Sequence, residues 1–234
     1  MSNFHQIHLP RGKSALLAIQ ISPRARRISL RVVPGKGCFD LVVPQGVATA
    51  KALEFAQSKA YWLESRCEIA TKKQPFAKGM LIQFRGNRIT IETTQQALRR
   101  VELTQDKLIV WDIRGNVDEL VSDWLKHQAK QRFLELANEK AAKLGKSFNN
   151  IKVRDTKTRW GSCSVRGNLN FSWRLIMAPD FVTDYIAAHE VAHLAHMNHS
   201  PYFWDKVAQL SPNSKKAKDW LREYGSSLHL LGGC

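Results

Sequence analysis

Four histidines and one glutamate between residues 189 and 199 constrain this chain more than any other feature. His189 and His193 are four residues apart, so on a helix their side chains lie on one face, one turn from each other. Two imidazoles placed in this way can bind one zinc ion, and Glu190 then lies beside the metal, where it can accept a proton from water. The spacing predicts a helix that carries a metal centre, with Glu190 as the general base of a hydrolase, and it favours a peptidase.

A catalytic zinc site takes three protein ligands and leaves the fourth position to water, so a third ligand is needed. His196 lies on the same helical face as His189, but their Cα atoms would be about 10.5 Å apart along a straight helix. Convergence of these two and His193 on one ion would therefore be strained. A carboxylate from a later segment, Asp219 or Glu223, is another option.

His199 is the third ligand that we favour, provided that the helix ends before it. Asn198 can adopt the left-handed conformation that terminates helices. Ser200 and Pro201 then supply an N-cap and a first-turn proline for a new helix. The chain would turn at His199 and return its ring to the metal, which leaves His196 as a supporting or surface group.

The charge of the chain is strongly positive and unevenly distributed. There are 36 Lys and Arg residues against 20 Asp and Glu residues, a net charge of +16. Residues 1–100 hold 17 basic and 5 acidic residues (+12), whereas residues 101–234 hold 19 and 15 (+4). This balance has two equally good interpretations. Either a nucleic acid or nucleotide is a partner of the N-terminal part, or the protein is a soluble enzyme that is rich in lysine. No helix-turn-helix, RNP or zinc-finger pattern indicates sequence-specific recognition.

Cysteine usage and hydropathy indicate a cytoplasmic protein. The cysteines are far apart and form no Cys-x-x-Cys pair, so neither a zinc ribbon nor a redox motif is expected. The N-terminus lacks the apolar core of a signal peptide, and no apolar run is long enough to cross a membrane. We expect no membrane partner and leave the oligomeric state open. The cysteines are Cys38, Cys67, Cys163 and Cys234.

Residues 1–115 have the pattern of a β-rich part. Turn residues at 34–37 lie between two alternating runs and predict a hairpin over 24–44, which carries Arg24, Arg26, Arg27 and Arg31. Apolar residues at helical spacing predict a helix over 48–73. The Gly86-Asn87 pair predicts a turn between two later strands. The predicted strands are 16–21, 28–32, 39–43, 80–84, 88–93 and 108–111.

Residues 116–234 have the pattern of a second domain. A long helix is predicted at about 117–144, and Gly145 is a reasonable stop signal for it. Asp180 is a candidate N-cap for the metal helix. The fold class is α+β: a β-rich N-terminal part, then a unit in which a small antiparallel sheet packs on the metal helix. The strands of that sheet are predicted at 151–155, 158–164 and 169–173.

With these residues in view, the chain resembles the YgjP-like metal-dependent hydrolases, a minimal zincin family related to the SprT-like and WLM-type metallopeptidases. The resemblance is carried by residues 159–164, 169–175 and 189–204, and by the ending His-Ser-Pro-Tyr-Phe-Trp in particular. It implies that residues 116–234 form a zincin-like unit that holds Zn2+. It supports His189, His193 and His199 as ligands and Glu190 as the catalytic residue.

In zincins an edge strand beside the cleft often holds the substrate backbone, and this resemblance implies that residues 160–164 are that strand. Trp160, Gly161 and Ser162 are therefore the candidate substrate-binding residues. As side chains, Trp160, Trp173 and Trp204 are expected in the core, and Cys163 is expected to be a buried neighbour of the site. Arg174 is either structural or a holder of a substrate anion.

Three functions follow from these observations. The first is a zinc metallopeptidase acting on a peptide or protein. The second is a metal-dependent nucleotide phosphoanhydride hydrolase, a pyrophosphatase, although the carboxylate cluster typical of Mg2+ sites is missing. The third is a nucleic-acid-associated protease or binding module, whose basic N-terminal part holds DNA or RNA.

Overall fold

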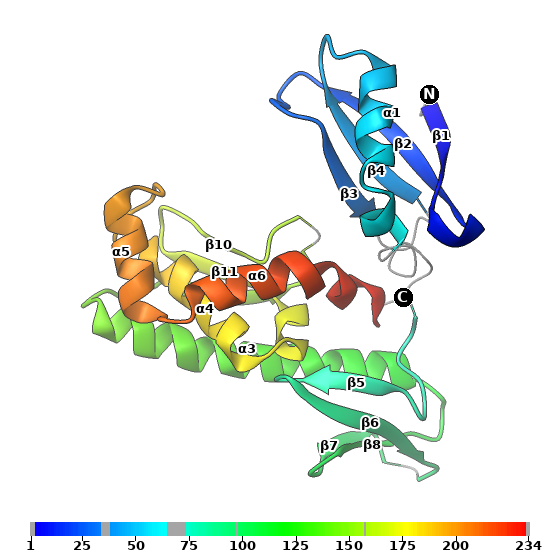
Figure 1. The fold of residues 1–234 in the computed structure, drawn as a ribbon. Helices are drawn as coiled ribbons and strands as arrows, with labels where there is room; N and C mark the ends of the chain where they lie inside the picture. Colours follow the sequence, from blue (N-terminus) through cyan, green and yellow to red (C-terminus); the bar gives the residue numbers. More distant parts are fainter. Residues whose placement is uncertain (1–2, 34–37, 65–73, 97, 157, 233–234) are drawn as a thin grey trace. The chain divides into compact units, whose positions relative to one another are not determined.

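Contacts within the chain divide it into two units, Met1–Gln74 and Pro75–Cys234, in a computed structural model (Figure 1). The structure describes residues 3–33, 38–64, 74–96, 98–156 and 158–232. The fold is α+β, as predicted, with a β-rich N-terminal part followed by helices. Among the described residues, no helix is both long and apolar enough to cross a membrane. A cytoplasmic location stays a prediction.

The first unit is a four-stranded sheet with helix α1 (Thr49–Gln57) beside its fourth strand. The sheet order is β1-β2-β4-β3, and the predicted hairpin is present because β3 pairs antiparallel with β4, with Leu30 opposite Leu41. Its turn, residues 34–37, lies outside the described residues. The predicted helix over 48–73 is interrupted: α1 ends at Gln57, and residues 60–64 are helical again. The rest of the prediction, residues 65–73, lies outside the described residues. The strands are β1 (Asn3–His8), β2 (Ser14–Ser22), β3 (Ser29–Val33) and β4 (Cys38–Pro44).

The second unit begins with another four-stranded sheet, of order β5-β6-β8-β7. Its pairings are antiparallel, parallel and antiparallel, the same succession as in the first sheet. The β5–β6 turn places Arg85 (φ 51°) and Gly86 (φ 83°) in the left-handed region, so the turn is one residue earlier than predicted. The strands are β5 (Leu81–Phe84), β6 (Asn87–Thr94), β7 (Arg100–Leu103) and β8 (Lys107–Trp111).

The long helix α3 (Val117–Lys143) joins this sheet to the later elements of the second unit, so the observed division of the chain at 74/75 differs from the predicted boundary at 115/116. Ile91 and Val110 of the sheet share one hydrophobic core with Leu125 and Phe133 of α3. The turn near residue 115 is a local feature, whereas this shared core holds the sheet and the helix in one unit. Helix α3 ends as predicted, because Gly145 adopts φ +59° directly after the C-cap.

A three-stranded sheet of order β10-β11-β9 precedes the helix that carries His189. The pair β10–β11 is antiparallel, as predicted, but β11 and β9 are parallel. The sheet is therefore mixed, and β9 and β10 lie at its opposite edges with β11 between them. β10 is an edge strand, which matters for the site. The strands are β9 (Asn150–Arg154), β10 (Gly161–Cys163) and β11 (Asn168–Ser172).

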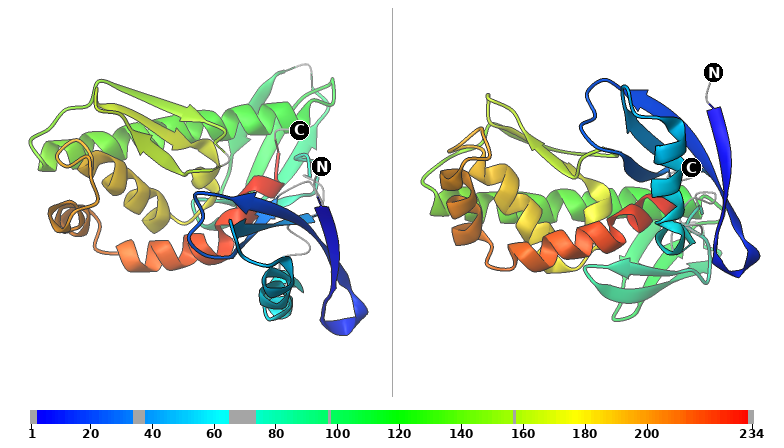
Figure 2. Two further views of the ribbon diagram at one scale, coloured as in Figure 1. Left: turned by 90° about the horizontal axis from the view of Figure 1, so that it is seen from above. Right: turned by 45° about the horizontal axis from the view of Figure 1, so that its top comes forward.

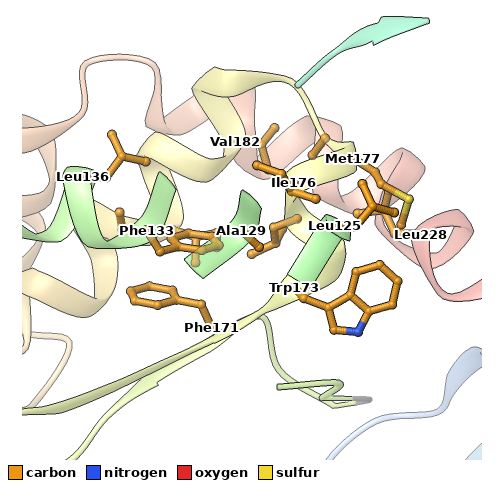
Figure 3. Close-up of a cluster of buried hydrophobic side chains, with 14 of the residues drawn as sticks. Leu125, Ala129, Phe133, Leu136, Phe171, Trp173, Ile176, Met177, Val182 and Leu228 are labelled. Carbon is orange, nitrogen blue, oxygen red and sulfur yellow. The ribbon is translucent and has the colours of Figure 1, made fainter. Parts of the chain in front are cut away.

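Three helices and two short 3-10 segments complete the unit (Figure 2). The core lies between α3, β11 and the segments that follow, where the rings of Phe133 and Phe171 stack with centroids 4.2 Å apart (Figure 3). Trp173 and Met177 are also fully buried there. The elements are η2 (Trp173–Met177), α4 (Asp180–Ala192), α5 (Pro201–Leu210), α6 (Ser214–Tyr224) and η3 (Gly225–Leu230).

Asp180 does not cap α4 as predicted; Pro179 is the N-cap residue, and Asp180 is the first helical residue. The Asp180 carboxylate accepts two hydrogen bonds from Arg85, at 2.9 Å from Nε and 2.8 Å from Nη2. A bidentate guanidinium offers this carboxylate stronger hydrogen bonds than a free backbone N–H does. The ion pair thus fastens the start of α4 to the β5–β6 turn.

Candidate active site

Three histidines gather at the end of α4 and the start of α5. His189 is in the last turn of α4, His193 is its C-cap residue, and His199 lies in the link before α5. One ring nitrogen of each lies within 4.8 Å of the other two. His189 Nε2 and His199 Nε2 are 3.2 Å apart. Two nitrogens bound to a tetrahedral zinc at about 2.05 Å would be about 3.3 Å apart, so the spacing of this pair fits such an ion.

The other candidate ligands lie outside this cluster. Among the described residues, the group of His, Cys and carboxylate atoms close enough to hold an ion contains neither His196 nor Asp219 nor Glu223. His196 supports the site through its backbone instead, because His193 Nδ1–H donates to the His196 carbonyl at 3.0 Å. That hydrogen bond leaves Nε2 of His193 as the nitrogen that carries a lone pair.

The helix ends earlier than the sequence predicted. α4 stops at Ala192, so the turn begins at His193, and Asn198 does not have the positive φ that was expected of it. The restart of the chain agrees with the prediction, since Ser200 is the N-cap residue of α5 and Pro201 is its first residue. The early end gives the chain six residues in which to bring His199 back to the cluster.

Burial keeps the imidazoles of His189 and His193 in the neutral form that binds metals. It lowers the pKa of His189 to about 4, with further lowering from the neighbouring His193, His199 and Lys218. Burial is also the largest cause of the lowered pKa of His193. Neutral rings offer a nitrogen lone pair at neutral pH. Nδ1 of His189 is buried and has no hydrogen-bond partner among the described residues.

Phe203 forms an aromatic floor under the three histidines, a role that the sequence did not suggest. Its ring is fully buried, and its centroid lies 5.0, 4.5 and 4.7 Å from the ring centroids of His189, His193 and His199. A rigid apolar wall on one side restricts the rotamers of the rings and keeps water from that side. The signal in the sequence is the short spacing from His199, which places Phe203 in the first turn of α5.

Trp204 lies beside the site, not in the core as expected. It is 37% exposed, and its ring is 5.7 Å from that of His189 and 5.6 Å from that of His199, measured between centroids. Lys218 Nζ of α6 lies 4.0 Å from the Trp204 ring, close enough for a cation–π contact. Helix α6 therefore brings a positive charge near the outer side of the histidine cluster.

Glu190 is buried in contact with the edge strand β10. It is 5% exposed, and burial raises the pKa of its carboxyl to about 8, against a smaller lowering by Arg159. A Cβ atom on Gly161 would lie 2.5 Å from Glu190 Oε1 and 2.7 Å from its Cγ. The carboxylate therefore packs directly on the glycine backbone. Glycine is the residue that permits this approach.

The hydrogen bonds of β10 show which of its backbone groups face outward. Ser172 N–H donates to the Trp160 carbonyl at 2.9 Å, and Ser164 N–H donates to the Asn168 carbonyl at 3.0 Å. Because residues alternate along an antiparallel ladder, Gly161 and Cys163 direct their N–H and C=O groups away from β11. Those groups form the free edge beside Glu190.

Of the other residues that the sequence analysis named, Cys163 lies next to the site, whereas Trp160 and Trp173 pack against other parts of the unit. Trp160 is half-buried and stacks on His229, with centroids 4.9 Å apart, and Trp173 is in the core as expected. Cys163 is half-buried, and burial together with the charge of Glu190 raises the pKa of its thiol to about 11, so it is a protonated neighbour of the site.

Arg174 is structural. Its side chain is almost fully buried, and its Nε donates to Asp155 Oδ1 at 2.7 Å. Its other nitrogens donate to backbone carbonyls at the C-terminal end of the chain: Leu228, Leu231 and Gly232. With its hydrogen-bonding capacity engaged in this way, Arg174 ties the C-terminal segment to the loop that leads into β10.

The basic hairpin belongs to the first unit. Arg24, Arg26, Arg27 and Arg31 are all exposed there. A nucleic-acid or nucleotide partner of this hairpin stays a prediction.

A helix with His-Glu-x-x-His, a third histidine beyond it and a buried glutamate against an edge strand is typical of metal-dependent hydrolases. Residues 26–224 match the family model described as YgjP-like, metallopeptidase domain. Since the match spans most of the chain, the protein belongs to the YgjP-like metallopeptidase family, which confirms the resemblance seen in the sequence.

Among the solved structures that are similar to part of the chain are two metallopeptidase zymogens. Abylysin of Pyrococcus abyssi is 21% identical with a TM-score of 0.36, and the match covers 42% of this chain and 98% of that one. Jannalysin of Methanocaldococcus jannaschii is 22% identical with a TM-score of 0.32, and the match covers 38% and 89%. A search of curated proteins found no match.

Proposed function

We propose that the protein is a zinc-dependent metallopeptidase in which His189, His193 and His199 bind the metal and Glu190 is the general base. The observation that carries the proposal is the meeting of three imidazoles and a buried carboxyl beside an edge strand. A nitrogen-only donor set suits zinc better than Mg2+ or Ca2+, which prefer oxygen ligands.

Glu190 is placed to move the proton that peptide hydrolysis requires. Bound zinc supplies Lewis acidity, which polarises a carbonyl and lowers the pKa of water. Glu190 accepts the proton of the attacking water and passes it to the amide nitrogen as the C–N bond breaks, so that an acid and an amine leave. Its pKa of about 8, set by burial, lies close to neutrality, where a group can both accept and return a proton.

The free edge of β10 is the proposed substrate-binding element. An extended peptide can add to an exposed strand edge through main-chain hydrogen bonds. Gly161 and Cys163 offer their backbone groups there, while Trp160 and Ser162 hold the strand to β11. A peptide on this edge would pass directly over Glu190, because Gly161 contacts that carboxylate.

The decisive test is peptide cleavage by the wild-type protein and by Glu190→Gln. We expect cleavage of an unfolded protein such as casein by the wild type, its loss on chelation and its return with zinc. We expect at least about a thousandfold loss in Glu190→Gln, because the proton transfer is lost while the metal ligands stay. Glu223→Gln is the matched control, since Glu223 is exposed and outside the histidine cluster.

Two outcomes would contradict the proposal. Cleavage that persists at wild-type rate in purified Glu190→Gln would exclude Glu190 as the base. A zinc-loaded wild type that cleaves no peptide, but hydrolyses nucleoside triphosphates, would favour the alternative phosphoanhydride hydrolase. The cluster of nitrogen donors argues against that alternative, because enzymes of this kind usually hold Mg2+ through carboxylates.

A further inference from the structure

A cavity of about 500 Å³ opens beside the histidine cluster, and the proposed mechanism makes no use of it. Three segments line it: residues 147–149 after α3, residues 164–167 of the β10–β11 turn, and residues 193–195 with Met197 after α4. Figures 1 and 2 show the end of α3, this turn and α5 at the same end of the second unit. His193, a proposed metal ligand, forms part of the wall.

The lining combines one cation with neutral polar groups, such as Ser147 and Asn149, and with apolar groups. Arg166 is the charged side chain of the wall, which contains no Asp or Glu. Within the described part of the chain, Arg166 has no ion-pair partner. Phe148 and Leu194 supply apolar surface, and Met197 is 48% exposed. These features fit an aliphatic stem that ends in an anion.

The free edge of β10 leads from Glu190 to this cavity. Gly161 contacts Glu190, and Ser164, three residues further along, lines the cavity. Three residues of extended strand span about 10 Å. A peptide paired with the outward backbone groups of Gly161 and Cys163 would therefore reach the cavity with a side chain two or three residues from the scissile bond. The volume lies within the range of ligand sites, about 300–1,000 Å³.

We propose that this cavity is a substrate subsite for a carboxylate, in the first place a glutamate side chain, and that Arg166 is its specificity-determining residue. The inference rests on the proposed peptidase function, because it assumes a peptide along β10. A substrate carboxylate could also be the C-terminal one. Both sources share the same chemistry, which is a bidentate acceptor for a guanidinium.

Binding to Glu190→Gln tests the subsite without dependence on turnover. The probes are short fluorescein-labelled peptides of alanine and serine, amidated at the C-terminus, with one Glu at successive positions and a matched set with Gln. A third set has Gln and a free C-terminal carboxylate, which separates the two sources. Fluorescence anisotropy gives Kd for each peptide at two salt concentrations.

We expect the peptide with Glu at one position to bind about tenfold more tightly than the matched Gln peptide, because the Glu carboxylate forms a charge-assisted hydrogen bond with Arg166. Arg166→Gln in the same background should remove this preference, and Arg166→Glu should favour a Lys peptide. Arg88→Gln, which removes an exposed arginine far along the sequence in β6, should retain it. Tighter binding of the free-carboxylate set alone would assign the cavity to the C-terminus of the substrate.

The subsite is overturned if Glu, Gln and free-carboxylate peptides bind equally, if none binds, or if the preference survives Arg166→Gln. Cleavage by the wild type is followed separately. Peptides that bind with the Arg166-dependent preference but stay intact would refute the peptidase function and support the carboxylate site. Cleavage without any difference between Glu and Gln peptides would refute the site and support the peptidase.

Discussion

Gly161 and Glu190 are packed so closely that a Cβ atom on the glycine would lie 2.5 Å from the carboxylate oxygen. One residue thus joins the edge strand to the metal helix at the point where chemistry is proposed. The contact fixes the carboxylate against backbone, so its position depends on the strand and not on a flexible side-chain neighbour. Any side chain at position 161 has to displace Glu190 or the strand.

Gly161→Ala should therefore damage catalysis more than stability of the metal site. We expect kcat to fall about a hundredfold, since a displacement of roughly 1 Å in a catalytic group can cost that much. Zinc content, measured by mass spectrometry, should stay near that of the wild type. Lys152→Ala, at an exposed position of the opposite edge strand β9, is the control, and it should change kcat little. An unchanged kcat in Gly161→Ala would show that the contact does not position Glu190.

His199→Ala and His196→Ala should separate the two histidine candidates for the third ligand. The ring of His199 is in the cluster, whereas His196 contributes its carbonyl, which alanine retains. We expect His199→Ala to lose bound zinc and His196→Ala to keep it, because removal of one of three ligands leaves a site with two. Titration with zinc against a chromophoric chelator gives the affinities. Equal loss in both variants would contradict this assignment.

The stability of the metal-free protein should depend on pH through Glu190. Burial raises the pKa of this carboxyl to about 8 from its ordinary value of 4.5, so the folded state prefers the protonated form. That stabilisation is full below pH 4.5 and is lost as pH rises toward 8. Glu190→Gln, which stays neutral, should become the more stable protein by roughly a few kcal/mol above pH 8.

Urea denaturation of both proteins in a chelator, between pH 5 and pH 9, measures this difference. The two free energies of unfolding should be similar at pH 5 and diverge with rising pH. If the difference between the two free energies of unfolding stays constant from pH 5 to pH 9, ionisation of Glu190 does not destabilise the folded protein.

Arg174→Met should destabilise the second unit. The substitution leaves the Asp155 carboxylate and the carbonyls at the C-terminal end without their shared donor. Removal of one partner of a buried pair costs about 3–5 kcal/mol, and the half-exposure of Asp155 places the expected loss near the lower limit. Urea denaturation measures it. Arg222→Met, which breaks the exposed pair with Asp219, should cost less than about 1 kcal/mol.

The sequence predicted the elements whose signals are local. Alternating apolar residues indicated the β3–β4 hairpin, Gly145 marked the end of α3, and Ser200-Pro201 marked the start of α5. Strands β1 and β7 were missed. The exposed Phe4 of β1 and the mostly exposed side chains of β7 leave little apolar pattern to detect. Short edge strands owe their structure to their partners, not to their own sequence.

Features that depend on contacts between distant elements could not be predicted from the residue pattern along the chain. The boundary near residue 115 rested on a turn, while the core that joins β5–β8 to α3 forms only in three dimensions. The floor made by Phe203 and the contact of Gly161 with Glu190 each join residues from different elements. Asp180 is of a residue type that often caps helices. Its carboxylate instead binds Arg85, which is 95 residues away in the sequence.

The ligand arrangement has a consequence for how metal-removal experiments are interpreted. His189 belongs to α4 and His199 to the link before α5, ten positions further on. An ion held by both would cross-link a helix to the loop that follows it, as a disulfide closes a loop of similar length. Chelation would then remove a structural cross-link as well as the Lewis acid of the reaction. Loss of activity alone would not distinguish disorder of the loop from loss of the catalytic metal. Glu190→Gln, which leaves all three histidines in place, is free of that ambiguity.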